Sequence, residues 1–491
     1  MSITVFDTKT NAKVPLRPLE PGHVKMYVCG ITAYDYCHIG HARSALVFDM
    51  IVRYLRHRGY RVTYVRNFTD IDDKIINRAR EQGVTCEELA ERFIRAFHQD
   101  MERLGVAPAD IEPRATEHIP EIIEMVETLI ERGYAYQAGN DVYYSVEKFK
   151  DYGALSRRGL DDMQAGARVA VNEQKRNPLD FVLWKGSKPG EPTWDSPWGP
   201  GRPGWHIECS AMSRKLLGDA FDIHGGGKDL IFPPHENEIA QSVGATGASF
   251  VQVWIHHGFV TIKDEKMSKS LGNFLTIRDV LEHYEPEVLR FFVFTTHYRK
   301  PLDFSESAMA DAQHGLDRLY QCVAEVEALP QGKAGRPSAI ADQERARLAG
   351  LEERFHVAMD NDFNTAQALG ALFDAMKAIN RVRQGLPHKV AAEDVAFLRQ
   401  RAQTLVELAN VLGLLTDEPA AYLARQRRRR LTSLNISEAE IEERIARRAE
   451  ARKARDWATA DAIRDELLAR GIELKDSADG TTWDIARTST D

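Results

Sequence analysis

The sequence predicts an α/β protein that begins with a parallel βαβ unit, and two observations support this fold class. In residues His23–Cys29, polar and apolar side chains first alternate and an apolar run then follows, which ends at Gly30. This pattern is typical of a strand followed by a turn. Apolar residues then recur every three or four positions from about His38 to Gly59, which predicts a helix, and Arg61–Val65 provides the next strand. Because the helix lies between them, we expect the two strands to be parallel and joined by a right-handed crossover.

The rest of the chain changes character twice. Residues 116–199 hold one helical pattern near 118–132, short strand-like pieces and a turn-rich tract, and this mixture predicts an insertion. The α/β pattern returns at Trp205. Residues 342–414 carry long amphipathic helical patterns, which predict a helix bundle, and a small α+β module is expected to close the chain.

Composition excludes several classes of protein. The 491 residues are 43% hydrophobic and 28% charged, with 65 Lys+Arg against 73 Asp+Glu, so a disordered, collagen-like or strongly basic chain is excluded. The length suggests about three domains. The sequence has no apolar run of the roughly 18 residues that span a bilayer, and Met1–Leu16 has no secretory signal pattern. Five scattered cysteines argue against a disulfide framework, and a cytoplasmic protein is expected.

Two histidines stand where the first strand passes into the first helix, in His38-Ile39-Gly40-His41. A helix N-terminus presents free N–H groups and partial positive charge to an anion. Two histidines three residues apart can both donate to phosphate oxygens, and glycine allows a flat base to approach the backbone. Taken alone, the pattern fits two ordinary surface histidines equally well.

A second motif, Lys266-Met267-Ser268-Lys269-Ser270, precedes Leu271-Gly272-Asn273. Two lysines on a glycine-bounded loop suit a pyrophosphate group whose charge grows during a transfer reaction. A single lysine-rich loop is usually only a solvated surface segment. The occurrence of both motifs in this order makes coincidence a poor explanation.

With these two motifs the chain resembles the class I aminoacyl-tRNA synthetases, and among them the cysteinyl-tRNA synthetase family. The resemblance covers nearly the whole chain. Further matching segments are Val24–His41, Val65–Lys74, Gly204–Met212, Asp222–Gly226, Asp360–Thr365 and Lys453–Ala458.

The resemblance implies a doubly wound, Rossmann-like catalytic domain with an insertion, followed by a helix bundle and a small anticodon-binding domain. The predicted boundaries are 1–115 and 200–250 for the catalytic domain, 116–199 for the insertion, 251–315 for a linking segment with the lysine loop, 316–415 for the bundle and 416–491 for the anticodon-binding domain. The implied reaction is ATP-dependent ligation of L-cysteine to its tRNA through cysteinyl-adenylate, with Mg²⁺ accompanying ATP. A monomer is expected.

The resemblance also implies the site residues. His38, His41, Lys266 and Lys269 would be catalytic, and Gly40 and Ser268 would join them in binding ATP. Thr69 and Trp205 would wall the cysteine pocket, and Asp229 would pair with the substrate's ammonium group. A single Zn²⁺ would bind the substrate thiolate, because a soft metal centre prefers sulfur to the hydroxyl of serine. Cys37, Cys86 and Cys322 match no ligand position.

The chain departs from the family at one metal ligand. The family's string is Pro-His-His-Glu-Asn-Glu, whose first histidine and last glutamate bind zinc, but here Pro234 occupies that histidine's position. His235 and Glu238 are three residues apart, and side chains at that spacing share a helix face. We therefore predict that Cys29, Cys209, His235 and Glu238 hold the zinc. A weaker site completed by His224 or water, and the absence of zinc, are the alternatives.

Two other functions fit parts of the sequence. A related ligase could transfer cysteine to an amino-sugar, but such enzymes lack the anticodon-binding module that the C-terminal 75 or so residues suggest. A non-catalytic tRNA-binding paralogue would be free to lose the two intact motifs. Residues 425–455 contain eleven Arg and Lys against five Glu, which suits tRNA phosphates or a solvated helix face. Trp457 and Trp483 fit base stacking and domain core equally well.

Overall fold

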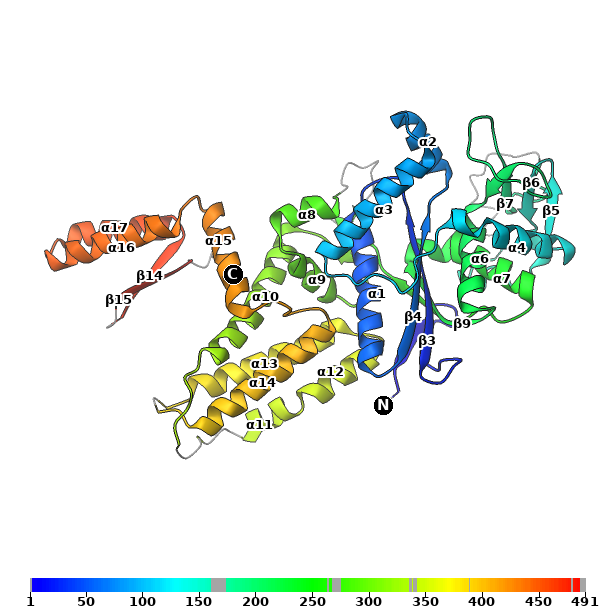
Figure 1. The fold of residues 1–491 in the computed structure, drawn as a ribbon. Helices are drawn as coiled ribbons and strands as arrows, with labels where there is room; N and C mark the ends of the chain where they lie inside the picture. Colours follow the sequence, from blue (N-terminus) through cyan, green and yellow to red (C-terminus); the bar gives the residue numbers. More distant parts are fainter. Residues whose placement is uncertain are drawn as a thin grey trace.

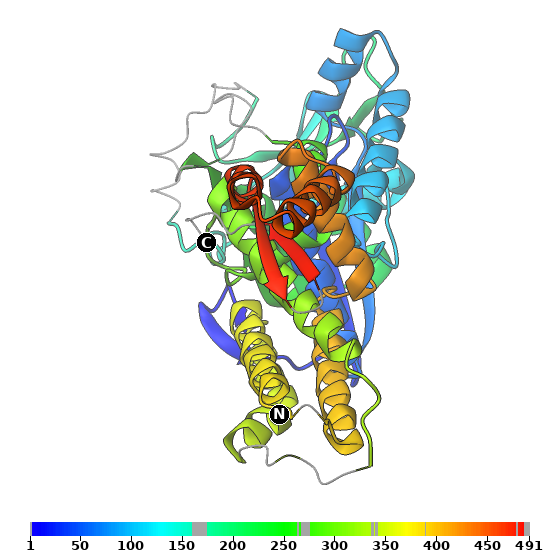
Figure 2. The same ribbon diagram turned by 90° about the vertical axis from the view of Figure 1, so that its left-hand side faces the viewer.

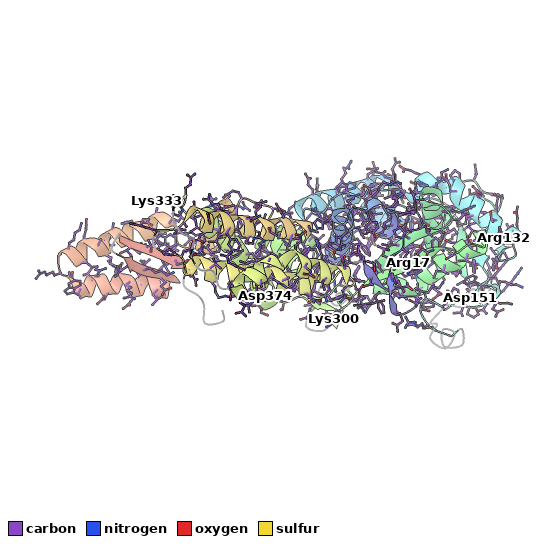
Figure 3. All side chains as sticks on the ribbon, turned by 90° about the horizontal axis from the view of Figure 1, so that it is seen from below. Arg17, Arg132, Asp151, Lys300, Lys333 and Asp374 are labelled. Carbon is purple, nitrogen blue, oxygen red and sulfur yellow. The ribbon has the colours of Figure 1, made fainter. Side chains whose placement is uncertain are left out.

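The structure is a computed structural model that describes residues 2–159, 174–262, 265–266, 275–334, 338, 342–387, 389–477 and 480–485. The molecule is elongated, with the insertion at one end and the C-terminal module at the other (Figures 1 and 3). Within the described residues, none of the helices combines the length and apolarity needed to cross a membrane.

A four-stranded parallel sheet in the order β10-β9-β3-β4 forms the centre of the catalytic region. Its strands are β3 (His23–Thr32), β4 (Arg61–Thr69), β9 (Phe221–Gly227) and β10 (Val251–His257). Neighbouring residues of β3 enter two different cores: Met26 and Val28 pack with helix α1 (Ile39–His57), whereas Tyr27 packs with α6 (Trp205–Leu217). Helices therefore cover both faces, and the predicted doubly wound fold class is confirmed.

Two further helices, α2 (Asp73–Gln82) and α3 (Cys86–Arg103), follow β4, and the hairpin β1 (Thr4–Asp7) and β2 (Ala12–Pro15) precedes β3. The insertion packs α4 (Ile119–Glu131) beside a four-stranded antiparallel sheet (Figure 1). Its strands are β5 (Ala135–Ala138), β6 (Asp141–Tyr144), β7 (Phe181–Gly186) and β8 (Gly201–Pro203). Helix α6 then returns the chain to β9 of the central sheet, and α7 (Glu236–Thr246) lies between β9 and β10.

The central sheet extends past the boundary predicted at residue 250, because β10 begins at Val251 and pairs with β9. Sequence patterning alone could not separate this buried strand from the linking segment. That segment contains a small sheet in the order β12-β11-β13 and two helices. These elements are β11 (Val260–Ile262), β12 (Glu265–Lys266), α8 (Ile277–His283), α9 (Pro286–Phe294) and β13 (Leu302–Asp303).

The helical region follows the linking segment. Its members are α10 (Glu306–Glu327), α11 (Asp342–Ala349), α12 (Leu351–Asp360), α13 (Thr365–Gln384), α14 (Ala392–Val411) and α15 (Pro419–Ser433). Helix α15 is fastened to α10 by Tyr422, whose ring stacks on Tyr320 with centroids 3.8 Å apart. Because Tyr422 is buried, α15 packs as part of the helical body.

The C-terminal module, which faces the viewer in Figure 2, has its own core, to which Leu431 of α15 also contributes. It contains α16 (Glu438–Lys453), α17 (Trp457–Ala469) and the hairpin of β14 (Ile472–Ser477) and β15 (Gly480–Ile485). Trp483 belongs to this core and donates from Nε1 to Glu442, whereas Trp457 is 58% exposed. Of the two tryptophans, Trp457 is therefore the one whose ring is open to a partner.

Candidate active site

The turn from β3 into α1 holds His38 and His41 in fixed tautomers. His38 caps the helix: its Nδ1 accepts the backbone N–H groups of Gly40 at 3.0 Å and of His41 at 3.3 Å. The Nδ1 of His41 accepts the N–H of His38 at 3.2 Å, and the two rings stack with centroids 3.8 Å apart. Because each Nδ1 accepts, each neutral ring carries its proton on Nε2, where it can donate to a phosphate oxygen.

Cys29 lies at the centre of the predicted metal cluster. Its Sγ lies 3.6 Å from Sγ of Cys209, 3.3 Å from Nε2 of His235 and 3.5 Å from Oε1 of Glu238. A tetrahedral Zn²⁺ with bonds of about 2.0–2.3 Å keeps its ligands about 3.3–3.8 Å apart. The three separations measured from Cys29 fall within this range, but the group whose ligand atoms all lie within 4.8 Å of one another contains His224 and not Cys209. β3, α6 and α7 bring together residues that are far apart in the sequence.

His224 is the competing ligand. The ligand atoms of Cys29, His224, His235 and Glu238 all lie within 4.8 Å of one another. His224 shares a 2.7 Å hydrogen bond between its Nε2 and Oε2 of Glu238, so it can orient that carboxylate as well as replace Cys209 in a ligand set. Its buried Nδ1 has no hydrogen-bond partner in the described part of the chain.

A second histidine orients His235. Nδ1 of His235 lies 2.8 Å from Nε2 of His256, whose Nδ1 lies 2.8 Å from Oγ1 of Thr8. Gly226 lies beside the ring, and a Cβ there would come within 2.9 Å of Cε1 of His235. The ring is therefore fixed on both sides, with Nε2 directed at Cys29.

The electrostatics of the cluster favour a bound cation. The hydrogen bond with Cys209, burial and the charge of Glu238 raise the pKa of Cys29 well above its ordinary value. Burial lowers the pKa values of His235 and His256, so both imidazoles are neutral at pH 7 and can act as ligands or neutral hydrogen-bond partners. Two thiols and a carboxylate in a buried site can ionise together only beside a positive charge, which a divalent metal supplies.

The residues predicted to contact cysteine lie in three different environments. Thr69 is buried, and its hydroxyl donates to Oε2 of Glu208 at 2.7 Å. Trp205 is 44% exposed, with its ring centroid 4.9 Å from that of His206. Asp229 is exposed and follows β9, and a Cβ on Gly227 would lie 2.4 Å from its Oδ1. Thr69 is thus hydrogen-bonded to the residue that precedes Cys209, and Trp205 and Asp229 are accessible.

Most of the lysine motif lies outside the described residues. Ser268 and Lys269 belong to this undescribed segment, and Lys266 is described only as part of β12. Both flanks of the segment are described. The preceding flank pairs within the small sheet of β11, β12 and β13, and the following flank is bridged through Thr276 to the turn that carries His38.

Sequence reasoning missed Asn67, Glu208 and the positioning role of His256. Asn67 Oδ1 accepts the N–H of Gly30 at 2.9 Å and lies 3.8 Å from Sγ of Cys209. A polar residue in the middle of the apolar strand pattern at Arg61–Thr69 was the available signal for Asn67. The partners of Glu208 and His256 are 139 and 248 residues away, so no local pattern indicates them.

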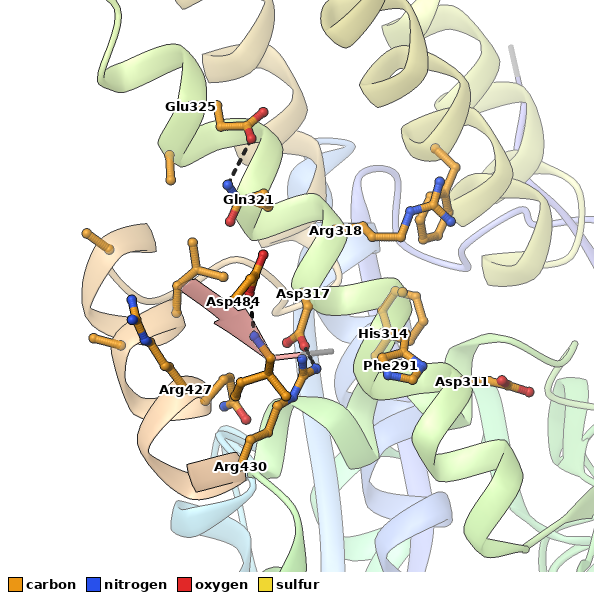
Figure 4. Close-up of a pocket in the computed structure, with 18 of the residues that line it drawn as sticks. Phe291, Asp311, His314, Asp317, Arg318, Gln321, Glu325, Arg427, Arg430 and Asp484 are labelled. Carbon is orange, nitrogen blue, oxygen red and sulfur yellow. Dashed lines mark hydrogen bonds and ion pairs between the residues drawn. The ribbon is translucent and has the colours of Figure 1, made fainter. Parts of the chain in front are cut away.

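A separate cleft of about 1540 Å³ lies between α10, α13, α15 and the C-terminal hairpin (Figure 4). Charges of both signs line it, and Arg430 pairs with Asp317 across it. Neither His38 nor any predicted metal ligand lines this cleft, so it is distinct from the candidate active site.

Comparisons with known proteins show the family to which the chain is related. A family model described as the class I (C) tRNA synthetase catalytic domain matches residues 15–314, a DALR domain model matches 354–416, and the cysteinyl-tRNA ligase anticodon-binding domain model matches 438–483. The chain is 60% identical to the cysteine–tRNA ligase of Desulfotalea psychrophila over 99% of this chain and all of that relative. The chain belongs to the cysteine–tRNA ligase family. The Geobacter sulfurreducens member is 55% identical with the same coverage.

Solved structures support the fold. Methionyl-tRNA synthetase from Mycobacterium tuberculosis, bound to methionyl-adenylate, superposes with a TM-score of 0.60 at 18% identity, over 79% of this chain and 90% of that one. A putative arginyl-tRNA synthetase from Campylobacter jejuni gives 0.53 at 13% identity, over 80% and 94%. The class I synthetase architecture of this family member is thus shared with enzymes of distant sequence.

Proposed function

We propose that this member of the family ligates L-cysteine to its cognate tRNA in two steps. The cysteine carboxylate attacks the α-phosphate of ATP, which forms cysteinyl-adenylate and releases pyrophosphate. A hydroxyl of the terminal ribose of the tRNA then attacks the carbonyl carbon, and AMP leaves. The observation that carries this proposal is the full-length match to the family together with the cluster of possible metal ligands Cys29, His224, His235 and Glu238.

His38, Gly40 and His41 bind ATP with Lys266, Ser268 and Lys269, and Mg²⁺ accompanies the nucleotide. The Nε2–H groups of both histidines donate to phosphate oxygens, and the two lysines stabilise the charge that grows on the leaving pyrophosphate. Since the reacting carboxylate is itself the nucleophile, these groups act by positioning and electrostatic stabilisation.

Cys29, Cys209, His235 and Glu238 hold one Zn²⁺, with His235 in place of the histidine that Pro234 has removed. The 3.3–3.6 Å separations around Cys29 support this set. His224 remains the competing ligand. When bound, zinc would supply a soft Lewis acid for the substrate thiolate. The hydroxyl of serine is a poorer ligand for such an ion.

The remaining contacts complete the cysteine pocket. Thr69, held by Glu208, contributes to its wall, and the accessible indole of Trp205 covers bound substrate. The Asp229 carboxylate pairs with the α-ammonium group. The accessible positions of Trp205 and Asp229 are compatible with these roles.

The C-terminal region binds the anticodon, and the enzyme acts as a cytoplasmic monomer. The domain boundaries predicted from the sequence are retained in this proposal, except that β10 belongs to the catalytic sheet. The match of residues 438–483 to an anticodon-binding domain favours a tRNA acceptor over an amino-sugar. Trp457 is the exposed aromatic candidate for stacking on a base.

Charging of tRNA by the full chain and by a version ending at Ser433 tests the proposal. This end point keeps α15 and its buried Tyr422. We expect the full chain to charge tRNA with cysteine. The shortened chain should keep cysteine-dependent ATP–pyrophosphate exchange but lose at least about tenfold in kcat/KM for tRNA, the equivalent of about 1.4 kcal/mol of binding energy.

The salt dependence of charging provides the control. Loss of Lys and Arg contacts to phosphates flattens the dependence of tRNA affinity on salt, so the shortened chain should show a smaller slope. Normal charging by the shortened chain would contradict the anticodon-binding assignment. Absence of cysteine-dependent exchange in the full chain would contradict the proposed reaction.

A further inference from the structure

Both ends of the segment that carries the lysine motif are attached to the first βα unit. On the N-terminal side, β11 pairs with β12 through Thr261 and Lys266, and with β13 through Val260 and Leu302. On the C-terminal side, Thr276 forms a backbone bridge with His38. The flanking hydrogen bonds run from the N–H of Ile39 to the oxygen of Leu275, 3.2 Å, and from the N–H of Ile277 to the oxygen of Cys37, 2.9 Å.

Arg43 joins the strands on the N-terminal side of the lysine segment to helix α1. Its Nη1 donates to the carbonyl oxygen of Phe259 at 2.6 Å, and its Nη2 donates to that of Tyr298 at 3.0 Å and to that of Lys300. Phe259 directly precedes β11, and Tyr298 and Lys300 lead into β13. A single side chain of α1, the helix that His38 caps, thus binds the segments that lead into β11 and β13.

The environment of Arg43 is unusual for an arginine. The residue is 1% exposed, and in the described part of the chain no carboxylate forms an ion pair with it. Burial lowers its pKa to about 10, so it stays protonated at neutral pH. Burying an unpaired cation is costly, and charge-assisted bonds to three carbonyl groups are what offset that cost here.

The two backbone segments that Arg43 contacts are packed closely against each other. A Cβ on Gly258 would lie 2.3 Å from the carbonyl oxygen of Lys300. The N–H of Gly258 donates to the oxygen of Tyr298 at 2.8 Å, and that of Leu302 donates to Phe259 at 2.9 Å. Arg43 therefore fixes a pair of strands as one unit.

We propose that Arg43 is a positioning residue that sets the root of the lysine segment relative to His38 and His41. It touches neither substrate nor metal in this scheme. The inference rests on the proposed function, in which Lys266 and Lys269 stabilise the pyrophosphate. Charges that act on a transition state must be placed within a fraction of an ångström, and a misplacement of about 1 Å costs about 10²-fold in rate.

Hydrogen exchange measures the anchoring directly. In Arg43→Met we expect faster exchange at the amides of Gly258, Leu302 and Phe304, which pair across the small sheet. Arg43→Lys keeps the charge but loses the planar fork, so its exchange should be intermediate. Arg56→Met is the matched control. Arg56 lies on the same helix but is exposed, and it donates to the exposed Asp110 and to the carbonyl oxygen of Val62 in β4.

Kinetics separate positioning from general loss of structure. In Arg43→Met the kcat of ATP–pyrophosphate exchange should fall about 10–10²-fold while the KM for cysteine stays nearly constant, with partial recovery in Arg43→Lys. Unchanged exchange at the three amides, or a KM for cysteine that rises as much as kcat falls, would overturn the inference. If the wild-type chain shows no cysteine-dependent activity, the proposed function fails, and the hydrogen-exchange result still decides the anchoring.

Discussion

The Lys269→Ala variant is expected to lose about 10²–10³-fold in the rate of ATP–pyrophosphate exchange, the usual effect of removing one electrostatic contact made in the transition state. In the proposed mechanism the lysine interacts with negative charge that develops only as pyrophosphate leaves. The affinity for cysteine, whose binding depends on the thiol cluster and its pocket, should therefore stay within about twofold of wild type. Steady-state exchange and cysteine binding by calorimetry measure the two quantities.

Lys333→Ala is the control for this experiment. Lys333 is exposed and lies between α10 and α11, far from the active site along the helical body (Figure 3). A parallel collapse of cysteine binding in Lys269→Ala would show that the lysine is not specific to the transition state. An unaffected exchange rate would remove Lys269 from the mechanism.

Replacing Cys29 with serine is expected to abolish both metal binding and cysteine activation. Cys29 contacts each of the other three predicted ligands, and a hydroxyl at this position is a hard, weak ligand for zinc. We expect substoichiometric zinc and at least about a 10²-fold loss of exchange activity, since even residues one step behind a metal ligand cost 10–100-fold. Cys86→Ser, at a half-buried thiol outside the cluster, should retain zinc and activity.

The comparison of His235→Ala with His224→Ala decides the fourth ligand. If His235 has replaced the missing histidine, His235→Ala loses zinc like Cys29→Ser, whereas His224→Ala keeps zinc with about 10–100-fold weaker affinity because it only orients Glu238. Stoichiometric, tightly held zinc in His235→Ala would assign the position to His224.

The sequence predicted the elements that local patterns define. The helix predicted to begin at about His38 is α1, and His38 caps it. The fold class and the family are confirmed. The site residues and the domain boundaries stay predictions.

What the sequence could not predict depends on contacts between distant segments. The hydrogen bond between Thr8 and His256 joins the residue that follows β1 to β10. Three carbonyl groups from two later segments surround Arg43. On sequence grounds the arginine run fits either a phosphate-binding surface or a solvated helix face. In the structure Arg430 pairs with Asp317 and the guanidinium of Arg427 lies 3.6 Å from the Trp483 ring centroid. Part of that charge is therefore used to attach the module.

The central claim is that a zinc ion held at Cys29 selects the thiol of cysteine. The most direct test exchanges the metal for Co²⁺ and follows the thiolate-to-metal absorption band as amino acids are added. The account predicts that cysteine intensifies the band, that serine leaves it unchanged, and that removing the metal abolishes discrimination between the two in ATP–pyrophosphate exchange. Purified protein that holds no metal yet still rejects serine, or a cobalt spectrum that cysteine does not alter, would contradict it.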